Sequence, residues 1–82
     1  MGNVSFDQWL QTEKKMSVRS AKDVISRQKR VKSIVGSDAI NDTTLDMLVS
    51  EKEFNQLTMY IKSQLKRSVK LTLEYQEMID AK

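Results

Sequence analysis

Apolar residues recur every three or four positions along most of the chain, which is the spacing of one face of an α-helix. Near the start, three of them fall on one edge of such a helix: Phe6, Trp9 and Leu10. Ser5 precedes them and Gln8 follows three positions later, which is the pattern of a capping box. This predicts a first helix over about residues 5–15. Its aromatic edge is expected in the core, with an exposed base-stacking platform as the alternative.

A longer amphipathic stretch follows between Ser17, a residue type that caps helix starts, and Gly36, which suits a left-handed C-terminal cap. At 100° per residue, six apolar residues fall on one side: Val18, Ala21, Val24, Ile25, Val31 and Val35. Six polar residues fall on or near the opposite side: Arg19, Lys22, Ser26, Lys29, Arg30 and Ser33. The pattern predicts a helix over residues 17–35 with an apolar inner face and a basic outer face.

The middle of the chain predicts a loop and two further helices. Residues 37–42 have loop composition, and Thr43 or Thr44 suits the cap of a short helix over about residues 44–49. Its inward residues are expected to be Leu45, Leu48 and Val49. Ser50 and Glu53 then form a second capping box, which predicts a helix over about residues 51–65. Its apolar period contains Phe54, Leu57, Ile61 and Leu65.

The helix either continues through residues 63–68 or breaks there, since nothing in this segment forbids helix. A break is favoured because Ser68 suits a new helix cap, and a last helix is then predicted over about residues 68–81. Its apolar residues fall on two sides: Leu71, Tyr75 and Met78 on one, Val69 and Leu73 on the other. Two apolar faces indicate either burial between neighbours or an exposed patch awaiting a partner. Burial is favoured, since the terminal helix of a small bundle packs on two others.

Composition supports one helical domain spanning residues 1–82. The length of 82 residues suits a single small core, and the absence of Pro with only two Gly favours helix throughout. No long Gly/Ser linker or internal repeat divides the chain. The predicted fold class is therefore all-α, a small bundle of four to five helices.

The residues for most catalytic and metal chemistry are missing. The chain has no Cys and no His, which excludes disulfides, zinc sites and Ser-His-Asp chemistry. Asp38, Asp42 and Asp46 are spaced by four and would form a carboxylate column on one helix, but the loop signals there interrupt it. There is no Gly-rich phosphate loop. We therefore expect no enzyme activity, metal, cofactor or small-molecule substrate.

Membrane and export signals are missing as well. No apolar run approaches the roughly 18 to 20 residues needed to span a bilayer, and the start of the chain lacks the apolar region of a signal peptide. The expected location is the cytoplasm, without membrane association.

Charge is arranged in blocks, although the whole chain carries only +3. Residues 14–32 hold eight bases and one acid, a net charge of +7. Residues 38–53 hold five acids and one base, giving −4, and residues 62–70 hold four bases and no acid, giving +4. A solvated helix face ordinarily mixes both signs. The unmixed basic face instead indicates an electrostatic footprint for phosphates.

The order of these elements resembles a known family. The stretches Ser5-Phe6-Asp7-Gln8-Trp9-Leu10 and Met16-Ser17-Val18-Arg19-Ser20-Ala21 are followed by a long helix ending at Gly36, a short helix and two more. Over nearly the whole chain, this is similar to the N-terminal core-binding, SAM-like helical domain of phage integrases and related tyrosine recombinases. The sequence departs from that family at Val24, where an aromatic residue is common, and its last helix matches only loosely.

The resemblance implies a non-catalytic helical clamp over duplex DNA, because the catalytic Arg and Tyr set of the family belongs to a separate domain. By position, the residues that would meet phosphate near the start of the second helix are Ser17, Arg19 and Ser20. The residues that would face DNA where the last helix begins are Lys66, Arg67, Ser68 and Lys70. The charge pattern selects the same two regions and adds Lys22, Lys29 and Arg30. No set of paired base-reading residues accompanies them, so sequence specificity is not predicted.

A second hypothesis is a small phage or mobile-element module that binds a host protein as an inhibitor or adaptor. The basic face would then meet an acidic protein surface, and the acidic block over residues 38–53 would be a docking patch of opposite sign. The salt dependence of DNA binding separates the two hypotheses, because phosphate-driven binding weakens steeply with salt.

Overall fold

Five α-helices follow one another along the chain in the computed structural model, which describes residues 5–80. They are α1 (Phe6–Thr12), α2 (Val18–Val35), α3 (Thr44–Ser50), α4 (Lys52–Asn55) and α5 (Met59–Asp80). No strand occurs within this described range. The prediction of an all-α bundle with four to five helices is confirmed.

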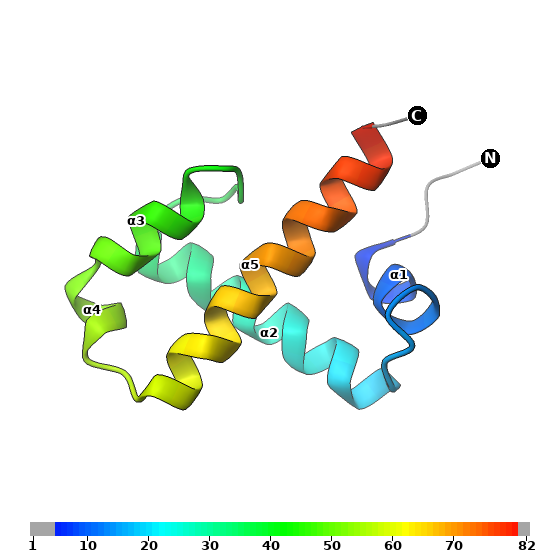
Figure 1. Cartoon of the computed structure of the whole chain (residues 1–82), viewed down its shortest axis with the longest axis horizontal. Coiled ribbons are helices and arrows are strands. Elements are labelled where there is room, and N and C mark those ends of the chain that lie inside the picture. Colours follow the sequence, from blue (N-terminus) through cyan, green and yellow to red (C-terminus); the bar gives the residue numbers. More distant parts are fainter. Residues whose placement is uncertain (1–4, 81–82) are drawn as a thin grey trace.

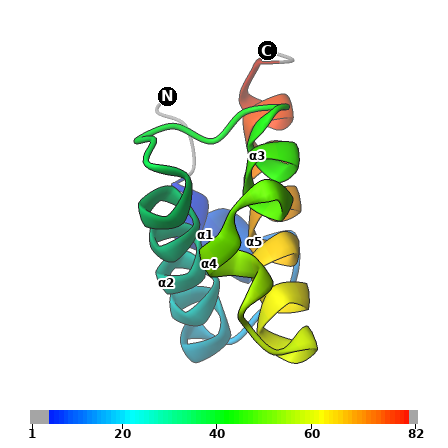
Figure 2. The ribbon, with the colours of Figure 1, turned by 90° about the vertical axis from the view of Figure 1, so that its left-hand side faces the viewer.

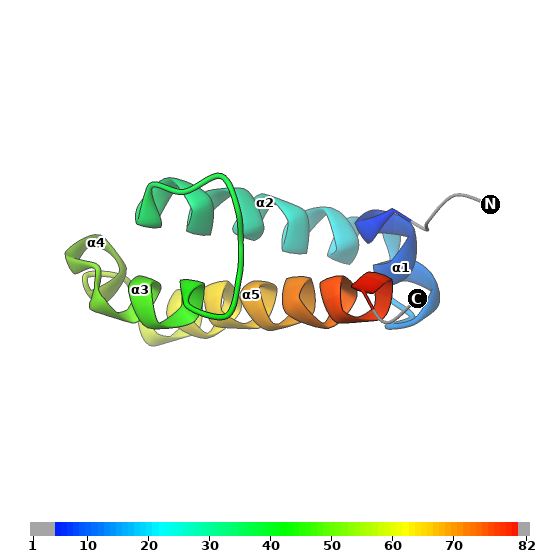
Figure 3. The ribbon, with the colours of Figure 1, turned by 90° about the horizontal axis from the view of Figure 1, so that it is seen from above.

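The two long helices, α2 and α5, cross each other and form the most extensive contact between elements (Figure 1). Seen from above, α2 forms one layer and α5 lies in the other, together with α3 (Figure 3). The view turned by 90° also places α2 on one side and α3 and α5 on the other (Figure 2). The short α1 lies beside the first half of α2 and the second half of α5, whereas α3 and α4 lie at the opposite end (Figure 1).

Two separate hydrophobic clusters follow from this crossing. The first lies at the end of the molecule that contains α3 and α4 and has seven buried members: Val31, Ile34, Ile40, Leu48, Phe54, Leu65 and Val69. The second lies at the α1 end and has five: Trp9, Leu10, Ala21, Val24 and Leu71. Each half of α2 therefore buries its apolar side against different partners.

The two apolar faces of the last helix are explained by the same arrangement. Val69 and Leu73 pack in the first cluster, and Leu71, Tyr75 and Met78 pack in the second. The preference for burial over an exposed patch is confirmed for Val69 and Leu71, and the other three side chains are partly buried against the same clusters. Trp9 is 5% exposed and belongs to the cluster that contains Val24 and Ile25, which confirms its predicted core position.

Three predicted helix caps are present. The Ser5 hydroxyl accepts a hydrogen bond from the Gln8 N–H, and the Ser17 hydroxyl accepts one from the Ser20 N–H. Gly36 has a φ of 69° and ends α2 in the left-handed conformation. The Ser37 N–H then donates to the Lys32 carbonyl oxygen, which completes the hydrogen bonding of a glycine-terminated helix.

The predicted break between Ser63 and Ser68 is wrong, because α5 is one helix from Met59 to Asp80. Ser68 lies in its interior, where its hydroxyl donates to the Leu65 carbonyl oxygen instead of capping a new helix. The N-terminal cap is Thr58, whose hydroxyl accepts a hydrogen bond from the Ile61 N–H. Position 81, included in the predicted last helix, lies outside the described residues.

The predicted helix over residues 51–65 is also wrong in its bounds. Its first part is the four-residue α4, and the chain turns over residues 56–58 before α5 begins. Ser50 makes no capping box with Glu53, because its hydroxyl donates to the Asp46 carbonyl oxygen at the end of α3. The Asn55 side-chain amide instead donates to the carbonyl oxygens of Val49 and Glu51, which holds the junction between α3 and α4.

Smaller differences concern helix ends and individual faces. The first helix ends at Thr12 rather than near residue 15, and Lys15 adopts a left-handed φ of 52° in the connection to α2. Val18 is 54% exposed and Val49 is 40% exposed, although both were expected to face inward. Each lies at an end of its helix, where fewer neighbouring residues cover the side chain.

Candidate nucleic-acid interface

The predicted basic residues of α2 are all exposed. We call Arg19, Lys22, Lys29 and Arg30 the outer basic face. They lie along an 18-residue helix that is about 27 Å long at 1.5 Å per residue. The distance along the axis from Arg19 to Arg30 is about 16 Å by the same rise.

One hydrogen bond shows which sides of the two long helices face each other. The Gln28 side-chain amide of α2 donates to the Thr72 hydroxyl of α5 over 2.9 Å. At 100° per residue, Arg19 and Arg30 lie on the side of α2 opposite Gln28. Arg19 and Arg30 therefore point away from α5 and into solvent, and Lys22 and Lys29 are exposed to one side of them.

Two of the predicted basic residues of α5, Lys66 and Lys70, do not join this surface. Lys66 and Lys70 are both exposed. Lys70 lies on the side of α5 opposite Thr72, and Lys66 lies close to Lys70 on the helix surface. Both therefore point away from α2. These two lysines and the outer basic face therefore lie on opposite broad faces of the molecule, and the sequence pattern could not show this because it does not contain the relative orientation of the two helices.

The three serines predicted to meet phosphate have different positions. Ser68 is only 1% exposed, and its hydroxyl is bonded to the Leu65 carbonyl oxygen, so this prediction is wrong. Ser17 and Ser20 are exposed at the start of α2, where the Ser17 hydroxyl donates to the Ser20 hydroxyl. The first-turn N–H groups of a helix lack intrahelical partners, which makes such an end suited to anions.

The positive charges are almost entirely uncompensated by ion pairs. Within residues 5–80 a single ion pair is formed, between Lys14 and Glu74 at 2.7 Å. The Lys14 ammonium group also lies 5.4 Å from the centre of the Trp9 ring. The outer basic face has no carboxylate partner in this range, so its charge is available to a phosphate or an acidic surface.

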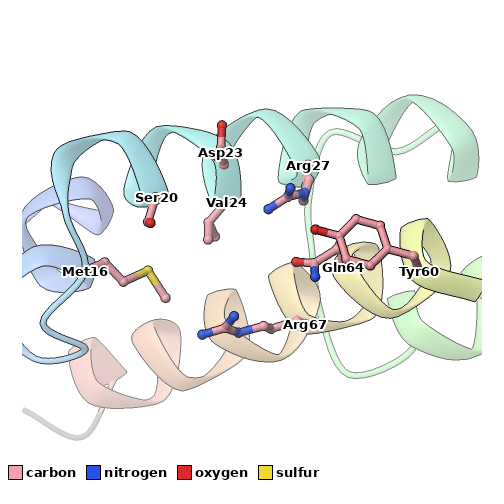
Figure 4. A pocket seen from close by; sticks show the side chains of 8 residues that line it. All are labelled: Met16, Ser20, Asp23, Val24, Arg27, Tyr60, Gln64 and Arg67. Atoms are coloured by element: carbon pink, nitrogen blue, oxygen red, sulfur yellow. The ribbon is translucent and has the colours of Figure 1, made fainter.

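A groove between α2 and α5 is not predicted by the sequence pattern. It lies where the first halves of the two helices diverge and has a volume of about 300 Å³. Its polar lining is Ser20, Asp23, Arg27, Tyr60, Gln64 and Arg67, and Met16 and Val24 add apolar surface (Figure 4). Arg67 and Ser20 are the two predicted site residues that the structure brings together here.

A signal for this groove was present in the sequence. Tyr60 follows Leu57 by three residues but lies about 100° around the helix from the centre of the side formed by Leu57, Ile61 and Leu65, and it is 67% exposed in the structure. Arg27 belongs to the basic stretch of residues 14–32 but lies between its two faces, so it was assigned to neither.

The acidic residues form no site of their own. Asp38 and Asp42 lie in the irregular segment before α3, so the column with Asp46 does not form. Between residues 5 and 80 no three carboxylates come close enough to hold a metal ion. No helix in that range combines the length and apolar character needed to cross a bilayer.

Comparison of the chain with known proteins identifies no relative. The chain matches no family model, no curated protein and no solved structure.

Proposed function

We propose that this chain is a non-catalytic DNA-binding module that holds the phosphate backbone of duplex DNA on the outer basic face of α2. The observation that carries the proposal is the set of four exposed basic side chains on one straight helix, none of them ion-paired within the described residues. Unpaired Lys and Arg side chains release counterions from DNA when they bind phosphates, which supplies sequence-independent affinity.

The dimensions of α2 support this proposal. The basic side chains extend over about 16 Å of helix axis, and the major groove of B-DNA is about 12 Å wide. Side chains near the two ends of the face would therefore reach phosphates on both edges of the groove. The resemblance to integrase core-binding domains supports the same partner, and the proposal includes the cytoplasmic location expected from the sequence.

A fluorescence anisotropy titration with an arbitrary DNA duplex at 50 and 200 mM salt tests the proposal. We expect binding to weaken by more than about tenfold between these two salt concentrations, because several phosphate contacts are involved. The variant Arg19→Glu/Lys29→Glu/Arg30→Glu should lose binding while keeping its circular dichroism spectrum. It changes the net charge from +3 to −3.

A matched control changes the net charge equally on other surfaces. Lys52→Glu/Lys66→Glu/Lys70→Glu also gives −3, and all three side chains are exposed. This variant should keep most of the duplex affinity, because Lys66 and Lys70 point away from α2. Equal loss in both triple variants would attribute binding to net charge and contradict the assigned surface.

A second candidate function, a protein-binding module, is favoured by apolar exposure at the start of α5. Met59 is 83% exposed and Tyr60 is 67% exposed, next to each other. Exposed aromatic and Met side chains are enriched at protein interfaces. If the unaltered chain shows no duplex affinity at 50 mM salt, this candidate replaces the first, and Met59 and Tyr60 are the first residues to mutate.

A further inference from the structure

Two arginines from different helices line the α2–α5 groove without a partner. Arg27 belongs to α2 and Arg67 to α5, and within residues 5–80 neither forms an ion pair. Guanidinium groups keep their charge at any physiological pH, and they bind phosphate through directed N–H donors. Two such groups on opposite walls of one groove repel each other unless an anion lies between them.

One acid, Asp23, also lines the groove, so its net charge is +1. It is spaced four residues from Arg27 but makes no ion pair with it. The Asp23 side chain is directed away from α5, whereas the Arg27 side chain points toward α5 (Figure 4). The positive charge that faces the groove therefore comes from the two arginines, and Asp23 lies at the rim.

Tyr60 supplies an aromatic surface at the same groove. Of the five aromatic side chains, Phe6, Trp9 and Tyr75 pack against one another and Phe54 is buried in the first cluster. Tyr60 alone is left outside the core. Exposed aromatic rings beside positive charge are the combination on which unpaired bases stack.

We propose that the groove binds one unpaired nucleotide of a DNA strand. Its phosphate lies between Arg27 and Arg67, its base stacks on Tyr60, and the Gln64 amide offers a donor and an acceptor to the base edge. A volume of about 300 Å³ is at the small end of the range for ligand pockets, so the groove has room for a single nucleotide unit rather than a duplex.

The groove adjoins the surface assigned to the duplex. Arg27 and Arg30 are three residues apart and therefore about 60° apart around α2. A duplex on the outer basic face would bring an unpaired end or flanking single strand to this edge. The inference rests on the proposed function in that respect, and it predicts a preference for duplexes with a single-stranded tail over blunt ones.

The test compares a blunt duplex with the same duplex carrying a short thymidine tail, by anisotropy at a fixed salt concentration. We expect the tailed duplex to bind at least about fivefold more tightly. This factor corresponds to the lower end of the binding free energy contributed by one base stacked on an aromatic ring. Tyr60→Ala and Arg67→Gln should each lose most of this preference and bind the blunt duplex as the unaltered chain does. Tyr60→Phe should keep it, because the ring remains.

Met59→Ala is the matched control for Tyr60→Ala, since Met59 is the more exposed neighbour on the same helix turn and does not line the groove. It should leave the preference unchanged. Asp23→Asn should strengthen binding of the tailed duplex, because it removes the one negative charge at the rim. All of these side chains are exposed, so circular dichroism should show an unaltered fold.

The outcomes separate this inference from the proposed function. Equal binding of blunt and tailed duplexes, or a preference that survives in Tyr60→Ala and Arg67→Gln, overturns the groove assignment and leaves the outer basic face standing. Tyr60-dependent binding of a single-stranded oligonucleotide without any blunt-duplex binding supports the groove and overturns the proposed function.

Discussion

Gln28 of α2 donates a hydrogen bond to Thr72 of α5, and the Thr72 hydroxyl in turn donates to the Ser68 carbonyl oxygen, 2.8 Å away. The Thr72 hydroxyl thus acts as acceptor and donor inside the molecule, where Thr72 is 4% exposed. This bond joins the two layers of the fold. Its position shows which sides of the two long helices face each other, and the outer basic face of α2 lies away from that side.

Replacing Thr72 by Val should lower the free energy of unfolding by about 1 to 2 kcal/mol, because the half-buried Gln28 amide loses its acceptor while the volume of the side chain is kept. Urea unfolding followed by circular dichroism measures this. The exposed Ser26→Ala should change stability by less than about 0.5 kcal/mol.

The double variant Gln28→Leu/Thr72→Val should recover part of the lost stability, since replacing both partners by apolar groups leaves no unpaired polar atom. The two single effects would then fail to add. Strict additivity would mean that the two side chains do not interact in solution.

Gly36 is expected to be sensitive to substitution for reasons of backbone conformation alone. An added Cβ would meet no atom within 4 Å, yet the φ of 69° is one that L-residues rarely adopt. Gly36→Ala should therefore lower the free energy of unfolding by about 1 kcal/mol or more. Gly36→Asn should lower it less, because Asn tolerates the left-handed conformation. Equal losses for Ala and Asn in urea unfolding would contradict this explanation.

Trp9 is the single tryptophan of the chain and is 5% exposed, so its fluorescence reports on the second hydrophobic cluster. The native emission should resist quenching by iodide, and it should change together with the loss of helix during urea unfolding. Water-like emission from the folded chain would show that α1 is detached from α2 and α5. Lys14→Ala should alter the emission slightly and stability by less than about 1 kcal/mol, because the Lys14–Glu74 pair is exposed.

The features predicted correctly from the sequence are those determined by neighbouring residues. The Ser5 and Ser17 side chains cap N–H groups three residues later in the chain, and Gly36 adopts the left-handed conformation in which glycine is favoured. Such signals depend on the local chain and need no knowledge of the fold. The burial of Trp9 followed from the apolar period, because an aromatic edge on a short helix must pack against something.

The misplaced helix break shows what local signals leave out. Ser68 and Thr58 are both residue types that cap helices, and only their surroundings distinguish them. Ser68 lies between Leu65 and Val69, which are buried in the first cluster, so burial keeps this segment helical. Thr58 follows an exposed turn and caps the helix.

The arrangement of the candidate interface could be predicted only in part for the same reason. The outer basic face follows from the period of one helix, whereas the positions of Lys66 and Lys70 depend on how α5 is rotated against α2. That rotation is set by contacts such as the one between Gln28 and Thr72, which are distant in the chain. The α2–α5 groove requires both helices and has no counterpart in either helix alone.

Single substitutions on the outer basic face can show how many phosphates it contacts. The logarithm of the DNA binding constant should fall linearly with the logarithm of salt concentration, with a slope of about 0.9 for each phosphate contact. Arg30→Gln removes one such contact and should reduce the slope by about one. The measurement is a series of anisotropy titrations between 50 and 200 mM salt.

Lys66→Gln provides the sharpest comparison, because it removes the same charge from the opposite broad face of the molecule. It should leave the slope unchanged, as should Asp42→Asn and Asp46→Asn in the acidic block. A slope reduced as much by Lys66→Gln as by Arg30→Gln would place DNA on both faces, as a clamp would, and would return Lys66 and Lys70 to the interface. A slope reduced only by Arg30→Gln would exclude Lys66 from the interface, because replacing a residue that contacts no phosphate does not change the number of counterions released.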